Sequence, residues 1–240
     1  MGTLKVQLSA NAGVILSDGE RCLWIDALHR VPVAGFSCVS RLQWERMLDP
    51  ALVSPPDLML FSHYHPDHYS SSYLRGAHER YPAAAVASPR AELPDQILLA
   101  EEACKLEIKD VRILCRRTPH EGRGYETVAH YSFLILWGEA VLFIPGDAAL
   151  GSQALAELIG SRKISLALLN FPWVTRPSGI RFLAAHGDPK EEIIYHLPFA
   201  PDDTCRYRDL TARALARYED QAIHRQVLAE PFAALYFDLP

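Results

Sequence analysis

The chain has 240 residues, and 29 acidic residues outweigh 24 lysines and arginines to give a formal net charge of −5. This balance excludes a general electrostatic attraction to nucleic acid or an anionic membrane, and neither is expected as a partner. No linker or repeat divides the sequence, so we expect one domain over residues 1–240. Five cysteines without a C-x-x-C pair, together with the lack of a signal-like N-terminus, favour a cytoplasmic protein, while the oligomeric state stays open.

The first part of the chain has the pattern of a strand meander followed by alternating strands and helices. Strands are predicted at Leu4–Leu8, Gly13–Ser17, Arg21–Asp26, Asp57–Phe61 and Ala83–Ala87. Helices are predicted at Tyr69–Tyr81 and Ala91–Ala100. The proline-rich and aromatic segment 27–56 predicts a long loop with one short helix. A loop of this length inside a compact domain is usually functional, and we expect it to act as a substrate lid.

The second part of the chain repeats this alternation. Strands are predicted at Leu106–Ile108, Val111–Arg116, Val128–Trp137, Val141–Pro145, Ser165–Asn170, Glu192–His196 and Ala233–Phe237. Helices are predicted at Ser152–Ile159, Gly179–Ala185 and Asp209–Leu228. Strand-rich and helix-rich stretches in both halves predict an α/β fold with two sheets packed face to face and helices outside.

The run Ser62–His68 holds three histidines and an aspartate directly after a predicted buried strand. Imidazole and carboxylate groups are the ligands that zinc, iron and manganese favour in proteins. A loop of solvated histidines is the alternative, but it does not account for so many ligands in so few residues. The run therefore predicts a metal site.

Three further candidate ligands follow apolar strands: His120, Asp147 and His196. Each has a proline or glycine next to it or close by, which turns the chain at the strand end. His130 competes with His120, but it lies inside a predicted strand, where alternate side chains point into the sheet. We therefore favour His120 as the ligand and expect His130 to orient a ligand or a substrate group.

These residues resemble the metallo-β-lactamase-fold hydrolases, whose motif H-x-H-x-D-H is matched at every position by His63, His65, Asp67 and His68. The phrase around His120 looks most like the beta-lactamase-like hydrolases related to ascorbate-phosphate lactonases. The resemblance implies a four-layer αββα sandwich of two mixed β-sheets flanked by helices.

The same resemblance implies a dinuclear centre. One metal ion would be held by His63, His65 and His120, and the second by Asp67, His68 and His196, with Asp147 bridging the two. Two divalent ions are therefore expected, zinc by default and manganese or iron as alternatives. A hydroxide formed from the shared water would be the nucleophile, and Asp67 would orient that water or carry its proton.

The expected reaction is hydrolysis of a small-molecule ester, lactone, thioester or amide. A phosphodiesterase or nuclease using the same centre is the first alternative, and a non-catalytic metal-binding module is the second. Substrate contacts are expected from the segment 27–56, from Tyr64, and from Trp173 and Arg176 in a loop at residues 171–180. Aromatic packing is the competing role for the tryptophan.

Overall fold

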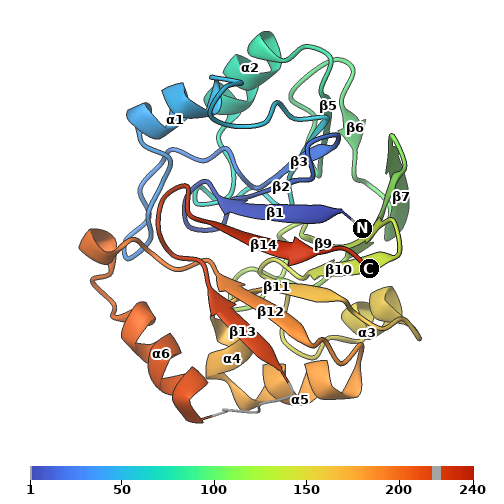
Figure 1. Ribbon diagram of the computed structural model, residues 1–240, viewed down its shortest axis with the longest axis vertical. Coiled ribbons are helices and arrows are strands. Elements are labelled where there is room, and N and C mark those ends of the chain that lie inside the picture. Colours follow the sequence, from blue (N-terminus) through green and yellow to red (C-terminus); the bar gives the residue numbers. More distant parts are fainter. Residues whose placement is uncertain (1, 218–222) are drawn as a thin grey trace.

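The computed structural model describes residues 2–217 and 223–240, whose strands form two seven-stranded sheets packed face to face (Figure 1). The first sheet contains, in spatial order, β14 (Ala234–Asp238), β1 (Thr3–Leu8), β2 (Val14–Ser17), β3 (Cys22–Ile25), β4 (Leu58–Leu60), β5 (Ala85–Ser88) and β6 (Ile97–Leu98). The second contains β13 (His224–Val227), β12 (Glu191–Tyr195), β11 (Leu166–Asn170), β10 (Ala140–Ile144), β9 (Tyr131–Trp137), β8 (Val111–Arg117) and β7 (Ala103–Ile108). Both sheets are mixed, because β3 to β6 and β10 to β13 run parallel and the other pairs antiparallel.

Helices cover the two outer faces of this pair of sheets. Figure 1 shows two of them on the side of the first sheet, α1 (Arg41–Met47) and α2 (Ser71–Arg80). The others lie on the side of the second sheet: α3 (Gln153–Ile159), α4 (Pro172–Thr175), α5 (Pro177–Ala185) and α6 (Tyr207–Arg217). A single 3-10 turn, η1 (Ala200–Asp202), precedes α6. The predicted four-layer αββα sandwich is confirmed.

The alternation of side chains along the strands explains the layers. In β9, Phe133 and Ile135 point into the core between the sheets, whereas Leu134 packs beneath α3 on the outer side. In β1, Leu4 and Val6 meet the same inner core from the opposite sheet. Full burial of one such side chain stabilises the fold by about 1.5–3 kcal/mol. Both faces of each sheet are thus apolar, which leaves the polar chemistry to the strand ends.

Three predictions of local structure are wrong. Residues 91–100 form turns and the short strand β6 instead of a helix, because Pro94 lacks an N–H group and the Gln96 side chain accepts hydrogen bonds from the Glu92 and Leu93 amides. The predicted loop at 171–180 contains α4 and the start of α5, each with a proline in its first turn, where proline is favoured.

The third error concerns the helix predicted over 209–228. The helix α6 ends at Arg217, and His224–Val227 form β13, parallel to β12; residues 218–222 lie outside the described part of the chain. Sheet pairing overrides the helical pattern here, and the buried carboxylate of Glu192 binds Arg225 at 2.7 Å across the two strands. The prediction of one short helix within 27–56 is confirmed by α1. Among the helices described, none has both the length and the apolar character needed to cross a membrane.

Candidate metal centre

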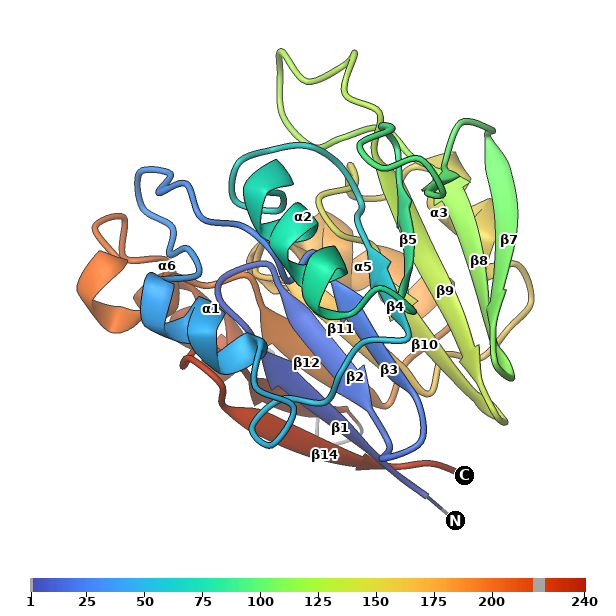
Figure 2. The ribbon, with the colours of Figure 1, turned by 90° about the horizontal axis from the view of Figure 1, so that it is seen from above.

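Strand ends from both sheets meet at one edge of the sandwich (Figure 2). The first sheet contributes the residues after β3 and β4, and the second contributes the last residue of β11 and the residues after β8, β10 and β12. Backbone hydrogen bonds link the sheets here: the Tyr131 amide donates to the Ser62 carbonyl at 3.0 Å, and the His196 amide to the Asn11 carbonyl at 3.1 Å. All candidate ligands predicted from sequence lie at this edge.

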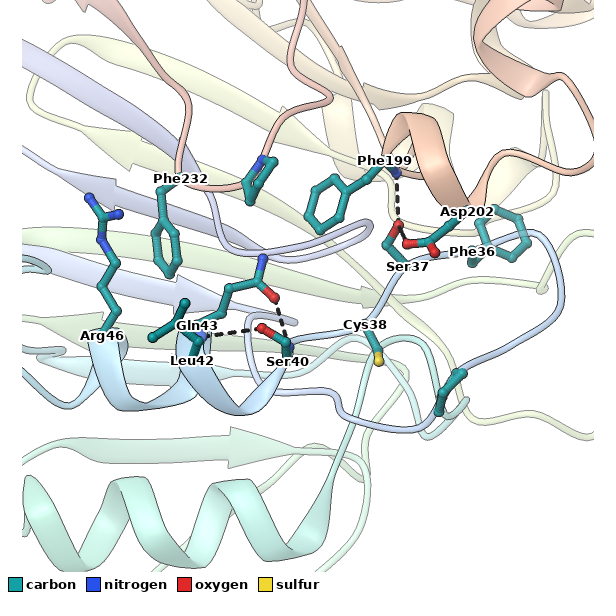
Figure 3. Close-up of a pocket in the computed structure, with 12 residues that line it drawn as sticks. Phe36, Ser37, Cys38, Ser40, Leu42, Gln43, Arg46, Phe199, Asp202 and Phe232 are labelled. Atoms are coloured by element: carbon teal, nitrogen blue, oxygen red, sulfur yellow. Dashed lines mark hydrogen bonds between the residues drawn. The ribbon is translucent and has the colours of Figure 1, made fainter.

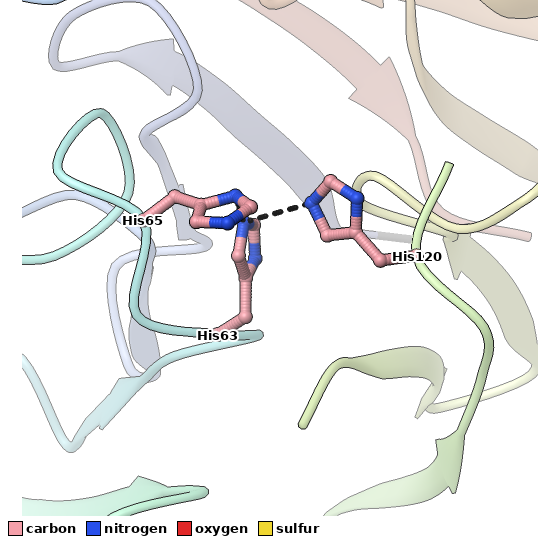
Figure 4. A group of neighbouring side chains, drawn as sticks. All are labelled: His63, His65 and His120. Atoms are coloured by element: carbon pink, nitrogen blue, oxygen red, sulfur yellow. Dashed lines mark hydrogen bonds between the residues drawn. The ribbon is translucent and has the colours of Figure 1, made fainter. Parts of the chain in front are cut away.

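The first ligand group contains His63, His65 and His120, whose rings turn toward one another in Figure 4. The His63 Nε2 atom lies 3.0 Å from His65 Nδ1 and 3.3 Å from His120 Nε2. Donors bound to one zinc ion at 2.0–2.1 Å stand about 3.3 Å apart in tetrahedral geometry. The spacing of these nitrogens therefore fits three ligands of a single cation.

The second group contains Asp67, His68 and His196, and all three are buried. The Nε2 atoms of the two histidines lie 2.9 Å apart. The Oδ2 atom of Asp67 lies 3.9 Å from His68 Nε2 and 3.7 Å from His196 Nε2. This arrangement fits a second cation with two nitrogen donors and one oxygen donor.

Asp147 stands between the two groups. Its Oδ2 atom lies 3.8 Å from His120 Nε2 on one side and 3.1 Å from His68 Nε2 on the other, and its Oδ1 atom lies 3.6 Å from His196 Nε2. Asn170 donates a hydrogen bond to Oδ1 at 2.8 Å and so fixes the orientation of the carboxylate. A carboxylate in this position can bridge two cations.

Hydrogen bonds to the far side of the rings assign the protons. The Asp26 carboxylate accepts hydrogen bonds from the Ser62 hydroxyl at 2.5 Å and from His68 Nδ1 at 3.0 Å. The Ser62 hydroxyl in turn accepts from His63 Nδ1 at 2.8 Å. With their protons on Nδ1, His63 and His68 keep the Nε2 lone pair free for a cation. One carboxylate thus orients one imidazole from each ligand group.

His120 and His130 have different roles. The His120 Nδ1 atom donates to the Glu121 carbonyl at 2.7 Å, which leaves Nε2 directed at His63. In His130, both nitrogens are already engaged: Nε2 accepts from the Asp147 amide at 3.0 Å, and Nδ1 donates to the Thr118 hydroxyl at 2.8 Å. His130 therefore holds the backbone of Asp147 and has no nitrogen left for a cation.

Electrostatics distinguish the ligands. Burial holds the pKa of His63 well below its usual value. Burial also opposes protonation of His68, but the charges of Asp147 and Asp67 outweigh it and hold the pKa of that imidazole well above its usual value. For Asp147, burial is outweighed by the charges of His196 and His68, so its pKa lies well below the ordinary range. Protons and divalent cations therefore compete for His68.

The three residues predicted to contact substrate, Tyr64, Trp173 and Arg176, lie in different surroundings. Trp173 is fully buried between Phe143 and Phe182, so the expectation that it contacts substrate is wrong and its role is packing. The Tyr64 hydroxyl hydrogen-bonds to the Ser88 hydroxyl and the Arg90 carbonyl, and its contact with substrate stays a prediction.

Arg176 is more than half exposed, at 55%, and pairs with Glu121 beside His120. It is therefore the predicted contact that remains close to the centre. The ring of Tyr125, which the sequence analysis did not select, packs against both His65 and His120 at centroid distances of 4.8 and 4.9 Å.

Sequence reasoning also missed Asp26, Ser62 and Asn170. A usable signal existed for Asp26 and Asn170, because each stands at the end of an apolar strand, as the predicted ligands do. Ser62 begins the histidine run, but its hydroxyl is not a usual metal ligand. Hydrogen bonding to a ligand, unlike coordination, has no sequence spacing that marks it.

No protein-family model matches the sequence, and no match was found among curated proteins. Solved structures do match over nearly the whole chain. They include the metallo hydrolase Igni18 from Ignicoccus hospitalis (14% identity, 99% of this chain and 100% of the other, TM-score 0.68). They also include the metallo-β-lactamase fold protein YhfI from Bacillus subtilis (14% identity, covering 99% of this chain and 100% of the other, TM-score 0.63). A third is an isothiocyanate hydrolase from Delia radicum gut bacteria (12% identity, covering 97% of this chain and 99% of the other, TM-score 0.66).

The chain has the metallo-β-lactamase fold. At identities of 12–14%, these likenesses establish the fold and not the reaction. The site adds buried clusters of histidine and aspartate suited to metal ions.

Proposed function

We propose that this chain is a hydrolase with two divalent metal ions that cleaves a small-molecule ester, lactone, thioester or amide. The observation that carries the proposal is the position of Asp147, whose Oδ2 atom lies 3.8 Å from His120 in one ligand group and 3.1 Å from His68 in the other. A single structural ion would need only one of these groups. Two groups joined by one carboxylate suit a hydrolytic centre.

Five imidazoles and two carboxylates would hold the ions, and this donor set suits zinc, with manganese or iron as alternatives. Bound there, the ions would lower the pKa of a water molecule toward neutrality and polarise the bond to be cleaved. Asp67 is the acidic ligand confined to one group, and we propose that it orients the attacking water and accepts its proton.

The surrounding residues set the geometry for this chemistry. Asp26 and Ser62 hold His63 and His68, while His130 and Asn170 hold Asp147. Because these partners are themselves buried, the ligands need little rearrangement when ions bind. Tyr125, 44% exposed, lies over His65 and His120 and would exclude bulk water from that side. Arg176 is proposed to contact the substrate beside it.

Substrate assays test the reaction class. We expect metal-dependent turnover of at least one member of an ester, lactone, thioester and amide panel. The panel should also contain an isothiocyanate, because one structural neighbour is an isothiocyanate hydrolase. Bis-p-nitrophenyl phosphate serves as the phosphodiester probe. Turnover of that probe alone would replace the proposal with the phosphodiesterase alternative.

Metal analysis tests the centre independently of the substrate. Protein purified without chelator should contain about two transition-metal ions per chain, and His65→Ala and Asp147→Ala should each lose metal and turnover while staying folded. Less than one ion per chain, with no rise in melting temperature on adding zinc, would favour a non-catalytic module. Full activity in either variant would remove that residue from the centre.

A further inference from the structure

A cavity of about 570 Å³ lies between α1, the segment 32–40 and the loops at 199–202 and 231–232 (Figure 3). Three phenylalanines, Phe36, Phe199 and Phe232, supply its aromatic walls, and all three are only partly buried. Leu42 also lines it and is 76% exposed. Cavities of roughly 300–1,000 Å³ with mostly apolar walls are typical of small-molecule sites.

Phe36 joins this cavity to the candidate metal centre. Its ring meets the His196 ring edge-on, with centroids 5.2 Å apart and an interplanar angle of 89°. A tight turn holds it there, in which the Phe36 amide donates to the Val33 carbonyl at 2.9 Å and Gly35 has a φ of +80°. A molecule in the cavity would therefore lie one ring away from a metal ligand.

The cavity has opposite charges at its two ends. Figure 3 shows Arg46 at one end and Phe36 with Asp202 at the other, with Phe232 and Phe199 between them. The Arg46 guanidinium lies over the Phe232 ring at 4.6 Å, and no carboxylate of the described residues pairs with it. At the other end, Asp202 accepts a hydrogen bond from the Ser37 hydroxyl at 2.6 Å. An anionic group is thus attracted to the Arg46 end and repelled from the Asp202 end.

We propose that this cavity binds the non-reacting part of the substrate, an apolar chain or ring that ends in a carboxylate. The carboxylate pairs with Arg46, the apolar part lies along Phe232 and Phe199, and the bond to be cleaved extends past Phe36 to the metal ligands. The assignment of this ligand as a substrate rests on the proposed hydrolase function. The binding site itself rests on the cavity.

Calorimetric titration of the purified protein with decanoate and with decanol, its uncharged counterpart, tests the site. Arg46→Gln should weaken decanoate binding about 5- to 10-fold and leave decanol binding unchanged, because a charge-assisted contact is lost while the apolar walls remain. Arg41→Gln is the matched control, since Arg41 lies on the same helix, is 91% exposed and pairs with Glu45 outside the cavity. It should change neither affinity.

Phe232→Leu should weaken the binding of both decanoate and decanol. Circular dichroism checks that this variant is folded. Decanoate affinity that is unchanged in Arg46→Gln and Phe232→Leu would overturn the proposal, because binding would then occur elsewhere, including at the metal ions.

Measurements of turnover provide a second test of the cavity. The wild type should prefer monomethyl suberate to dimethyl suberate in kcat/KM, and Arg46→Gln should lose that preference mainly through KM. Binding needs no turnover, so the two proposals can fail separately. Arg46-dependent decanoate binding, without hydrolysis of the suberates or of any substrate in the panel, would refute the hydrolase and keep the cavity as a carboxylate site. Hydrolysis with no effect of Arg46 would refute the cavity's role alone.

Discussion

The Oδ2 atom of Asp26 lies 3.0 Å from the Nδ1 atom of His68, and both side chains are almost fully excluded from solvent. The same oxygen accepts a hydrogen bond from Ser62, which holds His63. Asp26 adopts a left-handed backbone, with φ of +48°, directly after β3. A buried carboxylate thus determines the orientation of two of the candidate metal ligands.

Asp26→Asn should weaken metal binding about 10- to 100-fold. The carboxylate accepts from the Ser62 amide on Oδ1 and from the Ser62 hydroxyl and His68 on Oδ2, whereas an asparagine side chain has only one acceptor oxygen. Competition with a chelator of known affinity measures the change, and circular dichroism confirms that the chain is folded. Asp57→Asn is the control: this carboxylate also binds a backbone amide, that of Cys22, but it precedes β4 and lies away from the ligands. Equal metal affinity in the two variants would contradict the role of Asp26.

Gly146→Ala should destabilise the chain and reduce metal content. Gly146 has a φ of +58°, and an added Cβ atom would lie 2.9 Å from His130 Nε2, the atom that holds the Asp147 amide. Gly138→Ala is a close control, because its φ is +60° but its Cβ would meet nothing within 4 Å. The backbone cost of about 1 kcal/mol should be common to both variants. Urea unfolding should show a larger loss for Gly146→Ala, and metal loss should be confined to it.

Acid should destabilise the fold through His29. This residue is fully buried, and burial lowers its pKa to about 4, from 6.5 in an exposed chain. Between these two pH values the unfolded chain binds a proton that the folded chain does not, so the free energy of unfolding falls as the pH decreases through this window. The free energy of unfolding is lower by on the order of 3 kcal/mol at pH 4, and His29 contributes no pH dependence above pH 6.5.

His29→Gln removes this titration, so its unfolding free energy should fall less steeply between pH 6.5 and 4 than that of the wild type. Urea unfolding at several pH values, with chelator present in every sample, measures both slopes. Parallel curves for the two proteins would show that His29 stays protonated or is not buried in solution.

Trp173→Phe should lower stability without altering catalysis. The tryptophan belongs to α4 and packs against Phe143 and Phe182, and truncation of such a side chain to alanine costs about 3–5 kcal/mol. The smaller change to phenylalanine should cost about 1–2 kcal/mol, seen in urea unfolding. The KM of any substrate found should stay the same. A selective rise in KM would instead restore the tryptophan as a substrate contact.

The sequence was sufficient to predict the layers of the fold and to nominate the ligands. Short apolar strands marked the two sheets, and the ligands stand where those strands end, so His120, Asp147 and His196 could be selected without coordinates. Local patterns failed where distant partners decide the structure. The strand at 224–227 depends on pairing with β12, which its own residues do not reveal.

The sequence could nominate the candidate ligands, but apart from His130 it could not nominate the residues that hydrogen-bond to them. A ligand must have one of a few side chains, whereas the groups that orient it include a carboxylate, a hydroxyl and an amide from three separate segments. The cavity beside Phe36 was also hidden, although its segment was expected to contact substrate. Its walls come from residues 32–46, 199–202 and 231–232, which only folding brings together.

The ligand set joins the two halves of the sandwich. His68 follows β4 of the first sheet and His196 follows β12 of the second, 128 positions further along the chain, yet their Nε2 atoms lie 2.9 Å apart. A cation bound to both acts as a reversible cross-link that closes a very long loop, and such a link removes much of the freedom of the unfolded chain. A chain loaded with metal should therefore resist proteolysis longer than the metal-free chain.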